Sequence, residues 1–214
     1  GLASGAFIGF INGRLIAGFR IPPFIVTLGM LSMARGFAFV VTKGWPVSGL
    51  PESFLKIGQG YLWIIPIPVL FLVVIVLFMS ILLNRTVLGR YFYALGGNEE
   101  AARLSGVPVG KVKTMAYVLS GFLSAFAGIL LVARLGVAQS IVGQGYELDA
   151  IAASVIGGTS LMGGIGTISG VIIGAAIMGV LRNGLVLMGI SAFWQQIALG
   201  AIIVIAVALD KNRA

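Results

Sequence analysis

Charged and polar side chains that could contact a soluble partner are concentrated between Leu88 and Lys113. This segment holds two of the six acids of the chain, Glu99 and Glu100, together with several of its fourteen Lys and Arg residues. Apolar stretches long enough to cross a bilayer flank it on both sides. A polar, helix-forming loop within an otherwise apolar chain indicates a surface presented to a soluble protein.

Other kinds of chemistry have few candidate residues. The chain contains no Cys and no His, so thiol nucleophiles, the usual transition-metal ligands and the commonest general base are missing. The Gly-rich stretch 157–174 lacks the Lys and the spacing of a phosphate-binding loop, and its Gly166, Gly170 and Gly174 are spaced for close helix packing. We predict no catalytic residue, no metal site and no cofactor in this chain.

The polar loop, 84–113, contains a short predicted helix. An Asn can cap a helix through its side-chain oxygen, and two acids then fall in the first turn, where the helix dipole favours them. Two alanines continue the helix, and a Gly followed two residues later by Pro ends it. On these features alone, a solvated surface helix and a docking helix are both open. The residues of the motif are Asn98, Glu99, Glu100, Ala101, Ala102, Gly106 and Pro108.

Composition excludes an ordinary water-soluble domain. The 214 residues are 59% hydrophobic and 9% charged, with a mean hydropathy of +1.11, whereas globular domains have about 25% charged residues. The excess of basic residues is spread singly between apolar runs, which fits the positive-inside rule of membrane proteins better than nucleic-acid binding. We expect the lipid bilayer, and no nucleic acid, as a partner.

The apolar segments predict an all-α polytopic membrane protein. We expect one transmembrane domain over 1–214, with about six to seven spanning or partly spanning helices and a short helix in the polar loop. The 148–161 segment is short and could be tilted, broken or re-entrant. The predicted segments are 1–11, 24–42, 64–83, 114–133, 148–161, 167–183 and 193–209.

The ends and loops suggest an orientation. Gly at positions 1, 5, 9 and 13 shares one helix face, and we interpret the chain as beginning inside a packed transmembrane helix, without its N-terminal part. Lys and Arg favour the side of the 84–113 loop and the C-terminal DKNRA, which predicts a cytoplasmic C-terminus. The segment 43–63, with its Gly, Pro and aromatic residues, is predicted to be an irregular, partly interfacial outer connection.

One motif in the loop resembles a known family. The pattern E-A-A-x-x-x-G, formed here by Glu100, Ala101, Ala102 and Gly106, is similar to the core of the coupling loop in the membrane subunits of bacterial ABC importers. The later I-x-L-P portion of that motif is absent, which leaves the details of the contact open. Further stretches across essentially the whole chain resemble the ribose/monosaccharide branch of these permeases: Tyr93–Asn98, Val107–Val109, IPPFIVTLGM at Ile21–Met30, and YELDAIAASVIGGTSLMGGIGT at Tyr146–Thr167.

The resemblance implies a permease of the bacterial inner membrane that imports a ribose-like monosaccharide. Such permeases normally form a homodimer, dock on cytoplasmic ATP-binding subunits that bind ATP and Mg, and receive sugar from an extracytoplasmic sugar-binding protein. By this match the loop helix would be the contact that couples the permease to the ATPase. Candidates for the translocation path are Phe24, Thr27, Asn183 and Gln195, although helix starts and interhelical hydrogen bonds would also explain them.

Other functions for this chain can be judged by whether charged residues lie inside the spanning segments. Within the same family, a nucleoside, a signalling furanose or a branched-chain amino acid could be the solute. An ion-coupled secondary transporter would need acids placed mid-span, and a membrane scaffold gives no reason for the polar loop. Glu147 and Asp149 could pair with Arg134 or Arg35, contact a binding protein, or favour a helix start; Arg35 itself is expected to snorkel outward or face protein or water.

Overall fold

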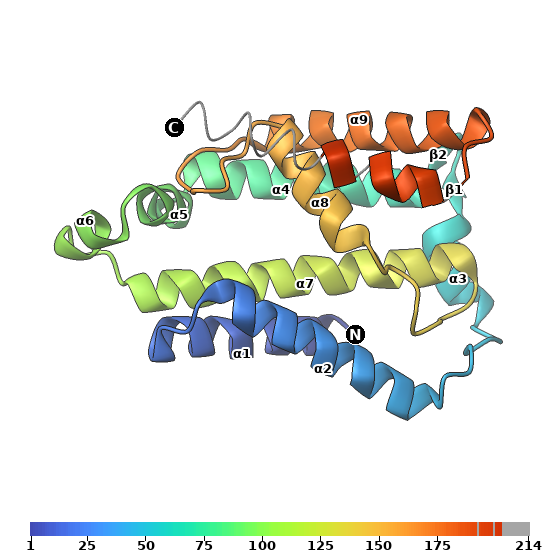
Figure 1. The fold of residues 1–214 in the computed structure, drawn as a ribbon, viewed down its shortest axis with the longest axis horizontal. Helices are drawn as coiled ribbons and strands as arrows, with labels where there is room; N and C mark the ends of the chain where they lie inside the picture. Colours follow the sequence, from blue (N-terminus) through green and yellow to red (C-terminus); the bar gives the residue numbers. More distant parts are fainter. Residues whose placement is uncertain (192, 199, 203–214) are drawn as a thin grey trace. The chain divides into compact units, whose positions relative to one another are not determined.

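A computed structural model describes residues 1–191, 193–198 and 200–202 of the chain (Figure 1). By their internal contacts they form two compact units, one of residues 1–92 and 100–142, the other of 93–99 and the described residues from 143 onward. The prediction of a single domain stays a prediction. The elements are α1 (Leu2–Phe19), α2 (Pro23–Thr42), α3 (Glu52–Gln59), β1 (Tyr61–Leu62), β2 (Ile65–Pro66), α4 (Ile67–Arg85), α5 (Val87–Gly97), α6 (Glu99–Leu104), α7 (Val109–Leu135), α8 (Tyr146–Ile156) and α9 (Ile168–Leu187).

The predicted all-α membrane architecture is confirmed. Five helices of the described part, α1, α2, α4, α7 and α9, are long and apolar enough to span a bilayer. They bury few side chains within the chain itself, and α4 has no fully buried residue. Because every backbone polar group inside lipid must be bonded internally, helices of this length and composition are the form such a chain can take in a membrane.

Several boundaries differ from the predicted ones. α1 continues past residue 11 to Phe19. The Arg14 guanidinium within this helix lies 5.7 Å from the centre of the Phe10 ring, so the cation has an aromatic partner on the same helix. α7 begins at Val109 rather than at 114. Lysines lie near its start, and because their long side chains can reach out of the apolar layer, the helix extends beyond the apolar segment. Of the predicted 193–209 segment, 193–198 and 200–202 are helical. The rest, with the C-terminal tail and its predicted orientation, lies outside the described residues.

In the first unit, α1 packs along α7 through its glycines. A Cβ at Gly5, Gly9 or Gly13 would collide with backbone or side-chain atoms of α7. The predicted glycine face is therefore a packing face, and the absence of side chains is what lets the two helix backbones approach closely.

The connection before α4 is more regular than predicted. It contains the helix α3 and a two-stranded antiparallel hairpin in which Leu62 pairs with Ile65. The connection is also tied to the end of α7, because Val47 and Ala138 exchange backbone hydrogen bonds of 2.9 and 3.0 Å. Composition indicated turns here, but these long-range contacts are invisible to local sequence patterns.

In the second unit, α8 packs on α9 through glycines of the Gly-rich stretch. A Cβ at Gly174 would collide with the backbone oxygen of Ala153, and one at Gly170 with that of Gly157. Two of the three predicted packing glycines are confirmed. Gly166 lies before the start of α9, and a Cβ there would lie 3.0 Å from the Thr159 hydroxyl oxygen.

Candidate functional site

The polar loop contains two consecutive helices. α6 (Glu99–Leu104) is the short predicted helix, with Asn98 directly before its first residue. The preceding helix α5 (Val87–Gly97) was not predicted. It brings the chain from the end of α4 to the start of α6, so α6 is carried on a regular element rather than on a flexible segment.

The end of α6 is closed by the predicted glycine. Gly106 adopts a φ of 82°, a left-handed conformation that glycine adopts without a steric penalty. The N–H of Val107 donates to the Ala102 oxygen, and the N–H of Gly106 donates to the Arg103 oxygen, both at 3.0 Å. This pair of bonds is a Schellman motif. Pro108 then directly precedes α7, so α6 is joined to α7 by a short, hydrogen-bonded turn.

The side chains of α6 divide between an exposed and a buried side. Ala102 is 5% exposed and packs within the chain, whereas Glu100 and Ala101 are exposed. Leu104 is 82% exposed. Together with Glu100 and Ala101, Leu104 gives this short, closed helix an exposed surface of mixed charged and apolar character. Leu104 was not among the predicted contact residues, because a lone Leu in the sequence indicates only helix propensity.

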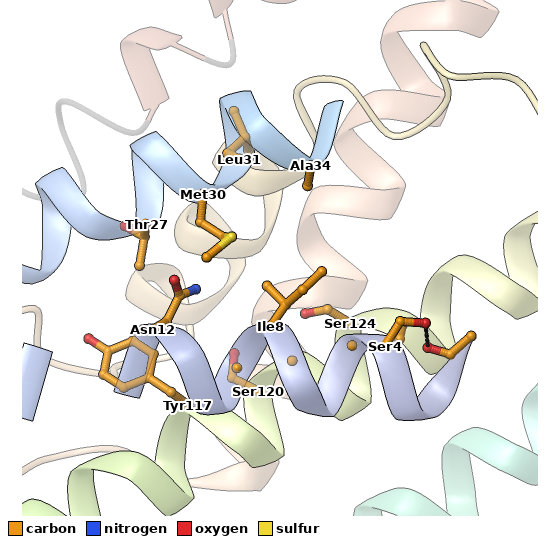
Figure 2. A pocket seen from close by; sticks show the side chains of 15 residues that line it. Ser4, Ile8, Asn12, Thr27, Met30, Leu31, Ala34, Tyr117, Ser120 and Ser124 are labelled. Atoms are coloured by element: carbon orange, nitrogen blue, oxygen red, sulfur yellow. Dashed lines mark hydrogen bonds between the residues drawn. The ribbon is translucent and has the colours of Figure 1, made fainter. Parts of the chain in front are cut away.

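A pocket with both polar and apolar lining, called the polar pocket below for its hydroxyl and amide groups, lies between α1, α2 and α7 of the first unit (Figure 2). Its volume is about 560 Å³. Figure 2 shows Thr27 and Met30 of α2 pointing toward Asn12 of α1. The hydroxyl-bearing and amide side chains that line it are Ser4, Asn12, Thr27, Tyr117, Ser120 and Ser124.

The groups in this pocket retain hydrogen-bonding capacity. The Oδ1 atom of Asn12 is buried and has no hydrogen-bond partner among the described residues. The Thr27 hydroxyl donates to backbone oxygens of its own helix, 3.0 Å to Pro23 and 3.2 Å to Phe24, and its own oxygen can still accept. Because the lining offers uncharged hydroxyl and amide groups among apolar side chains, it suits a polyhydroxylated solute better than an ion.

The other predicted path residues lie elsewhere. Phe24 is 72% exposed in the first turn of α2. Asn183 is exposed on α9 of the second unit. Gln195, also in the second unit, donates a hydrogen bond of 2.8 Å to the Ile190 oxygen, which is a local structural role. Among these four residues, the pocket includes only Thr27.

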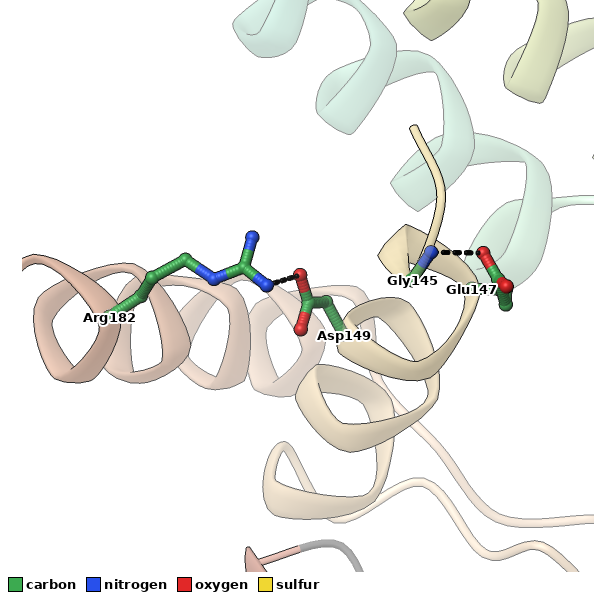
Figure 3. A network of polar contacts seen from close by, with 4 residues as sticks. All are labelled: Gly145, Glu147, Asp149 and Arg182. Carbon is green, nitrogen blue, oxygen red and sulfur yellow. Dashed lines mark hydrogen bonds and ion pairs between the residues drawn. The ribbon is translucent and has the colours of Figure 1, made fainter. Parts of the chain in front are cut away.

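Of the two acids at the start of α8, Glu147 takes the expected role at a helix start, whereas Asp149 has a partner other than those expected (Figure 3). Asp149 forms an ion pair with Arg182 of α9 at 2.9 Å, rather than with Arg134 or Arg35. Glu147 accepts a hydrogen bond of 3.0 Å from the Gly145 N–H, at the start of the helix. Both acids therefore have structural partners, and their place in the first turn of α8 is also favoured by the helix dipole.

Side chains that could bind a metal ion are scattered in the part of the chain that the structure describes. No group of three or more His, Cys, Asp or Glu side chains lies close enough together there to hold a metal ion. The candidate functional features argued from the described residues are the exposed short helix α6 and the pocket between α1, α2 and α7.

Comparison with known proteins identifies the family. Residues 1–207 match the model of the branched-chain amino acid transport system / permease component family. The chain belongs to this family. It is 47% identical over 205 residues to the ribose import permease protein RbsC of Bacillus subtilis (strain 168), covering 95% of this chain and 64% of that protein. It is 48% identical over 216 residues to RbsC of Escherichia coli (strain K12), covering 99% of this chain and 67% of that protein.

Family members with other sugars in their names are also similar. The L-arabinose transport system permease protein AraH of Escherichia coli (strain K12) is 42% identical over 203 residues, or 95% of this chain and 62% of that protein. This permease-family chain thus spans about two thirds of the length of the curated relatives it matches. No solved structure is significantly similar to it.

Proposed function

We propose that the chain belongs to the permease subunit of an ATP-driven importer that carries a ribose-like monosaccharide across the bacterial inner membrane. Family membership, similarity to ribose import permeases and the five apolar helices support this proposal. The observation that carries it is α6, a short closed helix with Leu104 82% exposed at its end. Neither a scaffold nor an ion-coupled transporter would need such a helix.

In this proposal α6 is the docking element for a cytoplasmic ATP-binding subunit, which binds ATP and Mg. Glu100, Ala101 and Leu104 would contact the ATPase, because their side chains are exposed. Ala102 and Gly106 would act indirectly, by packing α6 and closing its end. A helix of six residues is about 9 Å long, and such a short rigid body transmits a displacement that a floppy loop would absorb.

The polar pocket of the first unit is proposed to form part of the translocation path. Sugars carry several hydroxyl groups, each a donor and an acceptor, and the pocket offers Asn12, Thr27 and Ser120 as complementary groups. An extracytoplasmic binding protein would select the sugar, so the path needs only weak contacts. A second permease copy would complete the transporter.

The relatives of this chain are named for several different solutes. Relatives are named for ribose, L-arabinose and galactose/methyl galactoside, and the family description names branched-chain amino acids. The hydroxyl and amide groups of the pocket could bond the hydroxyls of a sugar, and the similarity to sugar permeases favours a sugar as the solute. Ion coupling is disfavoured for the two acids of α8, since Asp149 is paired with Arg182 and Glu147 is bonded to Gly145.

The test compares Leu104→Asp with Leu104→Met in the full-length protein, reconstituted in proteoliposomes with its ATPase and ribose-binding protein. We expect Leu104→Asp to lower ribose-stimulated ATP hydrolysis and uptake at least about tenfold, because it places a charge in an apolar contact. Leu104→Met keeps the apolar surface and should behave like the wild type. Ribose uptake by the wild type without any ATPase would contradict the proposal.

A further inference from the structure

The helix before α6 is joined to the loop between α8 and α9. The hydroxyl of Tyr93, on α5, donates a hydrogen bond of 2.8 Å to the backbone oxygen of Gly166. The bond is partly buried and connects residues 73 positions apart in the sequence. Figure 1 shows this loop running beside α5. The last turn of α5 therefore packs in the same unit as α8 and α9, although the chain continues from it directly into α6.

A second contact at the same place is made by backbone alone. A Cβ added to Gly96 would lie 2.5 Å from the backbone nitrogen of Gly164 and 3.1 Å from its Cα. A Cβ added to Gly164 would in turn lie 2.8 Å from the Cα of Gly97. No side chain fits between the two segments. Two backbones in direct contact move together, because a packed interface has no free space to take up a displacement.

The loop itself is tied to both of the helices it connects. The Thr159 N–H donates to the Ser154 oxygen of α8 at 2.9 Å. At the other end, the Thr167 hydroxyl accepts a bond of 3.1 Å from the Gly170 N–H and caps α9. Within the loop, the Ser160 N–H donates to the Ile165 oxygen at 3.0 Å. A push on this hydrogen-bonded loop is therefore passed to α8 and α9.

The opposite end of the connection reaches α6 without a flexible linker. The Asn98 N–H donates to the Ala94 oxygen at 3.0 Å, so the helical bonding of α5 extends to the residue directly before α6. A displacement of α6 is thus conveyed to Tyr93 and Gly96 through little more than one turn of helix.

We propose that Tyr93 and Gly96 form a mechanical link that carries the movement of α6 to the α8–α9 pair during transport. This inference rests on the proposed function, because it assumes that an ATPase moves α6. Tyr93 is a positioning residue in this scheme and touches neither the ATPase nor the sugar. The turn at Gly106 would carry the same movement into α7, so the link adds a second route from one docking helix.

The first test is Tyr93→Phe in the reconstituted full-length transporter with its ATPase and ribose-binding protein. The variant removes only the hydroxyl, and the loss of one partly buried hydrogen bond should lower the ribose moved per ATP hydrolysed about three- to tenfold. ATPase binding and basal hydrolysis should stay at the wild-type level. Tyr91→Phe is the matched control, since the Tyr91 hydroxyl of the same helix forms no hydrogen bond in the described part of the chain.

The second test uses the neighbouring glycines. Gly96→Ala wedges a methyl group against Gly164, whereas Gly97→Ala projects into open space. We expect Gly96→Ala to lower both the ribose moved per ATP, measured well below its unfolding temperature, and the midpoint of thermal unfolding, because the methyl group overpacks the contact. Gly97→Ala should lower neither. This pair separates the link from a general effect of alanine on α5.

The outcomes distinguish the link from the proposed function. Wild-type coupling in both Tyr93→Phe and Gly96→Ala would overturn the link and leave the importer proposal standing. Loss of bound ATPase from Tyr93→Phe would also overturn it, because Tyr93 would then only position α6 for docking. Sugar uptake by the wild type without an ATPase would overturn the importer proposal and the link together.

Discussion

Arg182 of α9 and Asp149 of α8 form an ion pair with 2.9 Å between Nη2 and Oδ2 (Figure 3). The same guanidinium lies 5.8 Å from the centre of the Tyr146 ring, a distance at which a cation is attracted to the ring. One side chain of α9 thus holds two residues of the first turn of α8. Because α8 has only 11 residues, contacts of this kind must supply stability that its length does not.

A double-mutant cycle on Arg182→Ala and Asp149→Ala tests this relationship. We expect each single variant to lower the stability of the protein in detergent by about 1 kcal/mol, and a coupling energy of similar size. The measurement is thermal unfolding of both single variants and the double variant. Purely additive effects would show that the two charges do not interact.

The local features of the fold could be predicted from the sequence. The glycines of α1, spaced four apart, and Gly170 with Gly174 of α9 indicated close helix packing, because a four-residue spacing puts small residues on one helix face. The position of α6 was predictable from the residues that begin and end it. Local helix rules suffice to find α6 and the glycine faces, although they do not give the helices on which those faces pack.

Features that depend on distant contacts could not be predicted. Arg134 and Arg35 were the two ion-pair partners considered for Asp149, and only the packing of α8 on α9 brings Arg182 to it. The polar pocket requires α1, α2 and α7 to meet. Ser120 and Ser124, four residues apart on α7, carried a signal that could have indicated a polar helix face.

Gly174→Ala is expected to destabilise the α8–α9 pair. The added methyl group would collide with the Ala153 oxygen, and such overpacking costs about 1–3 kcal/mol. The control is Gly179→Ala on the same helix, where a Cβ meets open space and the higher helix propensity of Ala adds up to about 1 kcal/mol of stability. In thermal unfolding in detergent, Gly174→Ala should have a lower midpoint than the wild type, whereas Gly179→Ala should not. Equal midpoints would show that the two backbones are not in contact.

Gly106→Ala is expected to loosen the end of α6. A Cβ there meets no neighbouring atom, so the cost arises from the φ of 82° and amounts to about 1–2 kcal/mol. Hydrogen exchange at the amides of Gly106 and Val107, which donate the closing bonds, should become about fivefold or more faster. Gly106→Asn should show a smaller effect, because Asn tolerates this conformation better than Ala. The same exchange rate in both variants and the wild type would contradict the assigned turn.

Single cysteines can show whether the pocket between α1, α2 and α7 is open to water. The 214 residues contain no cysteine, so a thiol introduced at Ser120 or Ser124 is the only one in this part of the protein. We expect both to react with a small charged thiol reagent in proteoliposomes, because a path for sugar must admit water. Val74→Cys is the control, on the strongly apolar helix α4, where lipid should exclude a charged reagent.

Protection of these thiols from the reagent by the sugar distinguishes a sugar path from a pocket that only admits water. Ribose delivered by the binding protein, with ATP present, should slow labelling at Ser120→Cys if the sugar passes this pocket, and it should not affect a residue facing lipid. Labelling of Ser120→Cys at the rate of Val74→Cys would show that the pocket is closed to water and would remove Thr27 from the proposed path. Because this readout depends on access rather than on turnover, it stays informative even where a variant transports slowly.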